Sequence, residues 1–261
     1  MHDPMKETAQ AKSILLQRHG ANDPVSDLVA IEEPLEIRID GHPVAVLMRT
    51  PGNDEELVIG FLITESILEN HHSIRKLELR PDENRALVFL KDDAAIDLGK
   101  LTRHIFSSSS CGLCGKATLD AVLSHSPALA SRLEVADQVL LDAPAKLRAA
   151  QSAFDSTGGL HGVALFSADG TLRVLREDIG RHNAVDKVIG HALQNDIILT
   201  ETFLLVSGRV SFEIMQKALV ARIPLVAAIS APSSLAVEFA QASGQTLIGF
   251  LRPPSFNRYA G

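Results

Sequence analysis

Residues 203–229 read FLLVSGRVSFEIMQKALVARIPLVAAI, and this stretch decides the fold class. It opens with a short apolar run, 203–206, and closes with a second one, 225–229, that follows Pro224. Between the two runs, apolar residues recur over 212–220 at the spacing of one helix face. Two short apolar runs joined by a helix are typical of neighbouring parallel strands in a sheet that helices cover.

The same alternation of strand and helix continues on both sides of this stretch. The expected strands are 163–166, 172–175 and 246–251, and the expected helices are 184–193 and 235–242. Ala168-Asp169-Gly170 is typical of a hairpin turn between the first two strands. We therefore predict an α/β fold for residues 146–261, a mixed sheet flanked by helices, with 246–251 as its last strand.

Residues 26–105 predict a smaller α+β N-terminal lobe. Its expected strands are 28–33, 36–39, 44–48, 74–79 and 86–90, and its expected helices are 54–67 and 96–104. Residues 1–25 are polar and mixed, and we expect them to be loosely ordered. A connector over 106–145 holds the two cysteines, and further helices are expected over 116–127 and 144–154.

The composition is that of a folded protein with an aliphatic core. Of 261 residues, 46% are hydrophobic and 4% aromatic, with no Trp, and these proportions exclude wholesale disorder. Residues 1–20 lack the basic segment followed by an apolar segment that is typical of a secretory signal. The apolar runs of the chain are far too short for a membrane span. We therefore expect a cytoplasmic protein without a membrane partner.

The net charge is acidic, because 25 Lys and Arg residues against 32 Asp and Glu residues give −7 at pH 7. This balance argues against generic nucleic-acid binding, so no nucleic-acid partner is expected. It leaves room for a small anionic ligand, because backbone amides and a few Arg side chains can hold phosphate locally.

The chain has only two cysteines, Cys111 and Cys114, in the segment SSSSCGLCGK at 107–116. One pair excludes a disulfide scaffold, and thiols stay reduced in the cytoplasm. Such a pair can be half of a zinc site, a dithiol centre, a persulfide carrier or two buried structural thiols. Zinc needs four ligands, and the ten His residues show no finger-type pairing, so we expect no metal bound directly by the protein.

The residues around the pair favour a reactive thiol. Gly112 and Gly115 carry no side chains that would cover the sulfur atoms. A helix is expected directly after the pair, and a helix N-terminus together with Lys116 lowers the pKa of a nearby thiol. Because the thiolate is the form that attacks sulfur, these features point to sulfur transfer or thiol exchange.

Six segments of the chain resemble the FdhD family, the formate dehydrogenase accessory sulfurtransferases. They are SSSSCGLCGK at 107–116, TGGLHGVALF at 157–166, REDIGRHNAVDKVIG at 176–190, VSGRVSFEIMQKA at 206–218, AISAPSSLAVEFA at 228–240 and TLIGFLR at 246–252. The likeness covers nearly the whole chain and is weakest in the first 25 residues and over 128–145.

The resemblance implies a sulfur carrier with sulfurtransferase activity. Members of the family take sulfur as a persulfide from a cysteine desulfurase and pass it to the molybdenum (or tungsten) bis-guanine-dinucleotide cofactor, their bound substrate. The cofactor then enters the formate dehydrogenase catalytic subunit. The persulfide-bearing cysteine of the family maps to Cys111 and the second cysteine to Cys114. The resemblance also implies a homodimer and a cytidine deaminase-like C-terminal lobe.

Three loops that join an expected strand to an expected helix are candidates for an anion site. They are 177–181, 206–209 and 230–234, whose amides, Ser hydroxyls and Arg side chains suit phosphate. In parallel α/β sheets such loops gather at one edge. Each loop also has a structural interpretation, because Ser233 or the next Ser is a good N-cap and Ser207-Gly208 a good turn.

The last expected strand runs into residues 250–256, which by resemblance map onto the family's cofactor-binding segment. There, Phe250 or Phe256 can stack on guanine and Arg252 can meet phosphate; alternatively, the strand simply ends at the Pro pair with Phe250 in the core. The residues expected to bind the cofactor are Ser207, Gly208, Arg209, Ser230, Ser233, Phe250, Leu251, Arg252, Pro253, Pro254, Ser255 and Phe256.

Two further features lie beside these loops. His161 is followed at the next position but one by Val163, so the H-x-E motif of zinc deaminases lacks its Glu, and we exclude deaminase chemistry. A charged cluster at an expected helix start consists of Asp178, Arg181, His182 and Asp186. This cluster is either a helix cap with an ion pair, or part of a cofactor site or dimer contact.

Two other functions fit a CxxC pair. A thiol–disulfide oxidoreductase has the same spacing, but thioredoxins usually place a Trp beside the pair, and this chain has none. A non-catalytic cofactor chaperone would use the thiols only to hold the cofactor or the partner enzyme.

Overall fold

The computed structural model describes residues 10–20, 23–92 and 122–261. The expected helix over 96–104 and the CxxC segment lie outside the described residues. Of the helix expected over 116–127, the described part shows helical residues at 122–125.

The centre of the molecule is a six-stranded mixed sheet with the order β12-β11-β10-β9-β7-β8. Its strands are β7 (His161–Ser167), β8 (Leu172–Asp178), β9 (Thr202–Val206), β10 (Leu225–Ala228), β11 (Thr246–Arg252) and β12 (Ser255–Ala260). Strands β9, β10 and β11 are parallel, whereas β7 is antiparallel to both β8 and β9. The mixed sheet flanked by helices is confirmed.

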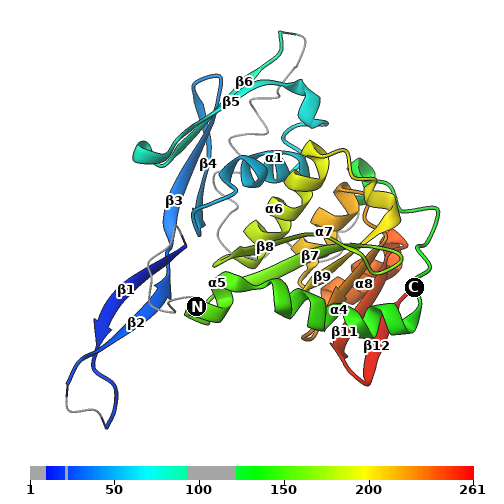
Figure 1. Ribbon diagram of the computed structural model, residues 1–261. Coiled ribbons are helices and arrows are strands. Elements are labelled where there is room, and N and C mark those ends of the chain that lie inside the picture. The colour runs from blue at the N-terminus through cyan, green and yellow to red at the C-terminus, as the bar shows by residue number, and fades with distance from the viewer. Residues whose placement is uncertain (1–9, 21–22, 93–121) are drawn as a thin grey trace.

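Helices cover both faces of this sheet (Figure 1). Helices α6 (Arg181–Gln194), α7 (Phe212–Val220) and α8 (Ser234–Ser243) pack on one face, and α4 (Asp137–Ala150) packs on the other. Alternate residues of a strand point to opposite faces, and every residue of β9 is buried. A strand buried on both sides reads as a continuous apolar run, which is why residues 203–206 carry the fold signal.

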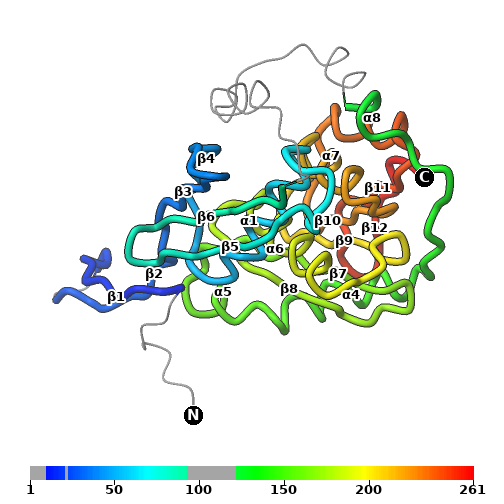
Figure 2. Tube along the Cα trace, turned by 90° about the horizontal axis from the view of Figure 1, so that it is seen from above, coloured from blue at the N-terminus to red at the C-terminus, as the bar shows by residue number. Residues whose placement is uncertain are grey.

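The N-terminal part forms a four-stranded sheet with the order β4-β3-β6-β5. Its strands are β3 (Glu33–Ile39), β4 (His42–Arg49), β5 (Ile74–Arg80) and β6 (Arg85–Leu90). Helix α1 (Asp54–Thr64) packs its Leu and Val side chains on this sheet and lies against α6 on its other side. Helix α1 thus joins the two sheets (Figure 2).

Two glycines allow α1 and α6 to lie unusually close. A Cβ atom on Gly60 of α1 would lie 1.9 Å from the carbonyl oxygen of Asp186. A Cβ atom on Gly190 of α6 would lie 1.8 Å from the carbonyl oxygen of Glu56. Because backbone atoms occupy both positions, no side chain fits at either residue.

Strands β1 (Ala11–Leu16) and β2 (Val25–Ala30) form a separate two-stranded arm that projects from the body (Figure 1). The loose order expected for residues 1–25 is therefore wrong for β1, whose polar residues obscure its pattern. The strand expected over 28–33 is also shifted, because β2 ends at Ala30 and β3 begins at Glu33.

The helix expected over 144–154 is two helices, α4 and α5 (Ser152–Thr157). Helix α4 begins at Asp137, seven residues before the expected start at Pro144, which lies inside the helix. The earlier start is explained by the buried face of the helix, which consists of Leu140, Ala143 and Leu147. The expectation of a last strand at 246–251 is also corrected, because β12 follows and pairs with β11 in antiparallel fashion.

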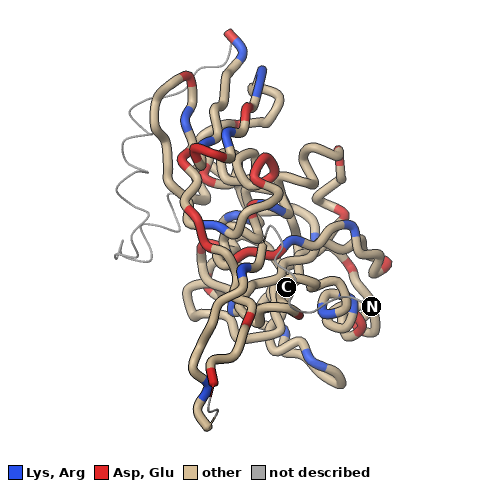
Figure 3. The backbone as a smooth tube through the Cα atoms, turned by 60° about the vertical axis from the view of Figure 1, so that its left-hand side comes forward, with Lys and Arg blue, Asp and Glu red and all other residues tan. Residues whose placement is uncertain are grey.

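Acidic and basic residues are interspersed along the described chain (Figure 3). Among the described residues, no helix combines the length and the apolar character that crossing a membrane requires.

Candidate functional site

The carboxyl ends of four strands meet at one edge of the central sheet. Strands β8, β9, β10 and β11 run in the same direction, and β7, which lies between β8 and β9 in the sheet, runs in the opposite one. The loops after β8, β9 and β10 therefore lie at one edge. Each of these loops leads into a helix, which brings the N-termini of α6, α7 and α8 to the same edge. The predicted gathering of the three loops is confirmed.

Backbone hydrogen bonds join these loops to one another. The amide of Val210 donates to the carbonyl of Ala231 at 3.2 Å, and the amide of Ser233 donates to the carbonyl of Val210 at 2.9 Å. The amide of Phe250 donates to the carbonyl of Ser230 at 3.0 Å. The β9 loop, the β10 loop and the start of the predicted tail, residues 250–256, therefore lie side by side.

Two of the predicted serines already have structural partners. The hydroxyl of Ser207 accepts a hydrogen bond from the amide of Gly162 at 3.0 Å. The hydroxyl of Ser233 accepts one from the amide of Ala236 at 3.2 Å and caps α8. The N-cap interpretation of Ser233 is thus confirmed, whereas the hydroxyl of Ser207 joins its loop to β7.

Phe250 is displayed at the surface, not packed in the core. Its side chain is 43% exposed, and its φ of 51° lies in the left-handed region that a bulky residue rarely adopts. A register shift in the β11–β12 pairing between Gly249 and Arg252 accompanies this conformation. Strained backbone within a strand, as here in β11, is often found at functional sites.

The rest of the tail divides into buried and exposed residues. Leu251 is fully buried, and Phe256 packs against the core on the α4 face. The Nε of Arg252 donates to the carbonyl of Ile229 at 3.2 Å, which ties the tail to the β10 loop. The exposed tail residues are Arg252, Pro253, Pro254 and Ser255.

A cluster of His161, Arg181 and Arg209, called the positive cluster because of its two arginines, lies at this edge. Burial lowers the pKa of His161, the nearby charges of Arg181 and Arg209 lower it further, and Asp178 opposes them. The Nε atom of Arg181 is buried, and the described residues offer it no hydrogen-bond partner. The charges of Arg181 and Arg209 suit a bound anion at this edge.

His182 neighbours this cluster on α6. Its Nε2 lies 3.3 Å from the hydroxyl of Ser211 and 4.0 Å from a carboxylate oxygen of Glu213. Burial, followed by the charges of Arg181 and Lys217, lowers the pKa of His182 to about 4. A catalytic triad needs the acid at the opposite ring nitrogen from the nucleophile, so this arrangement does not activate Ser211.

Asp178 and Lys187 form a buried ion pair beneath the positive cluster. Their charged atoms are 2.7 Å apart, and neither side chain is exposed. Asp178 also accepts hydrogen bonds from the amides of Thr50 at 3.1 Å and Gly180 at 2.8 Å, and from Asn183 at 3.0 Å. The capping interpretation of Asp178 is therefore wrong: the N-cap of α6 is Gly180, which makes no side-chain cap hydrogen bond, and Asp178 instead holds the turn before the helix.

Sequence reasoning missed Lys187 and Thr50. The position of Lys187 among the buried residues Val185, Val188 and Ile189 of α6 was the one available signal, because a buried ammonium group requires a partner. Asp186 points elsewhere: it pairs with Lys217 at 2.9 Å and accepts a hydrogen bond from Thr64 at 2.7 Å. Burial raises the pKa of Asp186 to about 6.

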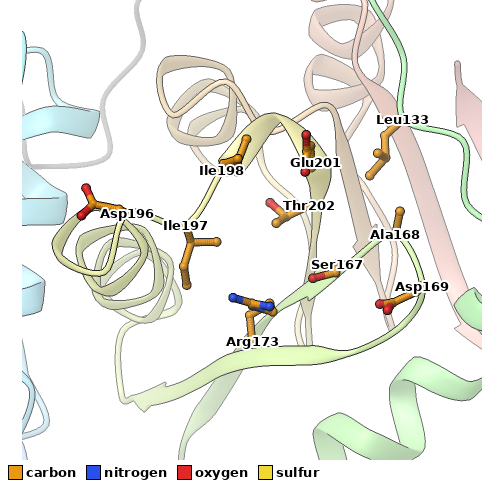
Figure 4. Close-up of a pocket in the computed structure, with 10 residues that line it drawn as sticks. All are labelled: Leu133, Ser167, Ala168, Asp169, Arg173, Asp196, Ile197, Ile198, Glu201 and Thr202. Carbon is orange, nitrogen blue, oxygen red and sulfur yellow. The ribbon is translucent and has the colours of Figure 1, made fainter.

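A cavity of about 530 Å³ lies at the opposite edge of the sheet (Figure 4). It is open and mixed in character, with Arg173, Asp169 and Glu201 beside the apolar residues Ile197 and Ile198. It is separate from the predicted loops, because it adjoins the ends of β7, β8 and β9 that face away from them.

Comparisons with known proteins agree with one another. The chain is 45% identical to a sulfur carrier protein FdhD from Streptomyces coelicolor, over 98% of this chain and 95% of the relative. It is 53% identical to a sulfur carrier protein FdhD from Mycolicibacterium paratuberculosis, over 89% of this chain and 90% of the relative. A crystal structure from Desulfotalea psychrophila, named as a formate dehydrogenase accessory protein, matches with a TM-score of 0.76 and 25% identity over 96% of each chain.

The family model agrees with these relatives. It is that of the FdhD/NarQ family, and it matches residues 30–261, which include both sheets and every loop of the candidate site and leave most of the projecting arm outside. The chain belongs to the FdhD/NarQ family.

Proposed function

We propose that this protein is a sulfurtransferase that carries persulfide sulfur on Cys111 to a guanine-dinucleotide cofactor held at the carboxyl edge of the central sheet. The observation that carries the proposal is the convergence of three helix N-termini and the cluster of His161, Arg181 and Arg209 at this edge. The relatives named sulfur carrier proteins support the sulfur chemistry.

The sulfur donor is a cysteine desulfurase, and the thiolate of Cys111 takes the terminal sulfur of its persulfide. In that step the Cys111 sulfur bonds to the terminal sulfur, the sulfur–sulfur bond of the donor breaks, and the donor cysteine leaves as a thiolate. The thiolate of Cys114 then attacks the Cys111 sulfur of the persulfide: the Cys111–Cys114 bond forms, the bond to the outer sulfur breaks, and that sulfur leaves as hydrosulfide towards the cofactor. Alternatively, Cys114 only assists the release of the sulfur.

The molybdenum or tungsten bis-guanine-dinucleotide cofactor is the bound substrate. Its pyrophosphate groups suit the positive cluster, because amides at helix N-termini and Arg side chains bind phosphate. The exposed ring of Phe250 offers a surface on which guanine can stack. In this proposal, the loops and the tail predicted from the sequence surround the cofactor. The C-terminal lobe that holds them has a cytidine deaminase-like fold.

The proposed setting is the cytoplasm, where a homodimer delivers the cofactor to the formate dehydrogenase catalytic subunit. The name of the Desulfotalea relative, a formate dehydrogenase accessory protein, supports this destination. No metal is bound directly by the protein in this account.

The test is complementation of a bacterial strain that lacks its own FdhD protein. Formate dehydrogenase activity should return with the native chain and stay absent with Cys111→Ala, whereas Ser110→Ala, a neighbouring control, should restore it. Full activity with Cys111→Ala would show that the protein acts as a chaperone without sulfur transfer.

A binding measurement tests the cofactor part separately. Isothermal titration of the native protein should give the highest affinity for GDP, a lower one for GMP and the lowest for guanosine. Equal affinity for GDP and guanosine would remove the phosphate site from the proposal.

A further inference from the structure

We infer that Asp178 and Lys187 are positioning residues, which fix the turn between β8 and α6 so that Arg181 faces the substrate's phosphate groups. The inference rests on the proposed function, since it concerns the same anion site. Neither residue touches the substrate, because both side chains are fully buried.

The bonds of Asp178 converge on this turn from both sheets. Asp178 ends β8, lies opposite His161 in the strand register, and accepts from the amide of Gly180, the N-cap of α6. Arg181 is the next residue, the first of the helix. The carboxylate therefore fixes the backbone on which the arginine stands.

Lys187 lies about 1.7 turns further along α6 than Arg181 and completes the network. Its ammonium group pairs with Asp178 and donates to the carbonyl of Thr50 at 2.8 Å. Thr50 in turn donates its amide to Asp178 and accepts the amide of Ile179 on its hydroxyl at 3.1 Å. The end of β4, the turn and α6 are thus held by one closed network.

Gly180 is required in this turn for reasons of space. A Cβ atom there would lie 2.8 Å from the Nδ2 of Asn183 and 3.4 Å from Oδ1 of Asp178. Asn183 itself donates to Asp178 and to the carbonyl of Met48 at 2.7 Å. Any side chain at residue 180 would displace a member of the network.

The test compares two buried ion pairs on the same helix. Asp178→Asn with Lys187→Met removes the pair beneath the site and leaves one acceptor oxygen where there were two. Asp186→Asn with Lys217→Met removes the matched control pair, which joins α6 to α7 at 2.9 Å. Melting temperatures report folding, and titration calorimetry with inorganic pyrophosphate reports the site.

We expect the first pair of substitutions to weaken pyrophosphate binding about tenfold, and the control pair to change it less than about twofold. In an Arg181→Gln background the loss from the first pair should vanish, because it acts through that arginine. A loss that persists without Arg181, or an equal loss in the control pair, would overturn the inference.

A second variant keeps the inference testable if the double variant Asp178→Asn, Lys187→Met does not fold. Gly180→Ala keeps every charge and should weaken pyrophosphate binding in the same Arg181-dependent way; unchanged binding would overturn the inference. If the native protein binds pyrophosphate and the variants bind it equally well, the inference fails while the proposed function stands. If the native protein does not bind it, the phosphate site falls and the inference with it.

Discussion

The imidazole of His161 lies directly against Gly208, with its Nδ1 3.2 Å from the point where a Cβ atom on residue 208 would stand. His161 is the first residue of β7, and Gly208 lies in the loop that follows Val206, the last residue of the neighbouring strand β9. The φ of Gly208 lies outside the left-handed region, so an alanine there would be opposed by the imidazole of His161, which must shift slightly, and not by its own backbone.

Gly208→Ala should therefore disturb the site without disturbing the fold. The new methyl group pushes His161 aside, and we expect GDP affinity to fall about fivefold, or about 1 kcal/mol. Titration calorimetry measures the affinity, and the melting temperature should stay within about 2 °C of the native value. Native affinity in this variant would exclude His161 from the binding surface.

Arg181→Gln should raise the pKa values of His161 and His182 together. The positive charge of Arg181 disfavours both imidazolium ions, so its removal makes each ring easier to protonate. Titration of the imidazole carbon-bound protons by NMR gives both values. Arg173→Gln, which changes an arginine at the opposite edge of the sheet, should move neither.

The contribution of His182 to the stability of the native protein should be lost as pH falls from 6.5 towards 4, whereas Asp186, whose pKa is raised to about 6, contributes with the opposite sign. Burial depresses the pKa of His182 to about 4 in the folded state, so the unfolded chain binds more protons within this window. Denaturant unfolding at several pH values measures the slope, and His182→Gln should reduce it. An unchanged slope in the variant would show that His182 does not hold the depressed pKa.

Gly190→Ala should destabilise the protein by about 3 kcal/mol or more, because its Cβ would overlap the carbonyl of Glu56 and force α1 away from α6. Gly159→Ala is the control, since the nearest atom to its Cβ is 3.7 Å away. Urea unfolding of the two variants should give clearly different midpoints, and equal midpoints would contradict the close helix contact.

Phe250→Gly should separate stability from binding. Glycine adopts the left-handed conformation without steric cost, so the free energy of unfolding should rise by about 1 kcal/mol. Affinity for GDP should fall because the stacking surface is lost, while affinity for inorganic pyrophosphate should stay native. A parallel loss of pyrophosphate binding would argue against separate base and phosphate contacts.

The sequence predicted the central sheet well because its signal is local. Residues 203–206 and 225–229 are buried on both faces, and the helix over 212–220 carries one apolar side, so the pattern reflects the fold directly. Strand β1 and the full length of α4 were missed, since polar residues in the first and Pro144 in the second obscure the period.

The candidate site was predicted in outline but not in its interior. The loops after β8, β9 and β10 were identified because a turn after an apolar run is visible in the sequence. The bond between Lys187 and Thr50 was not, since it joins residues 137 apart. Such contacts depend on how α1 places the N-terminal sheet against α6, which no local pattern encodes.

The measurement that tests the central claim most directly is the intact mass of the purified protein after incubation with a cysteine desulfurase and cysteine. The account predicts an added mass of about 32 Da, one sulfur atom, that a reductant removes. The adduct should be absent in Cys111→Ala and present in Ser110→Ala. An unchanged mass of the native chain, or an adduct that survives in Cys111→Ala, would contradict the account.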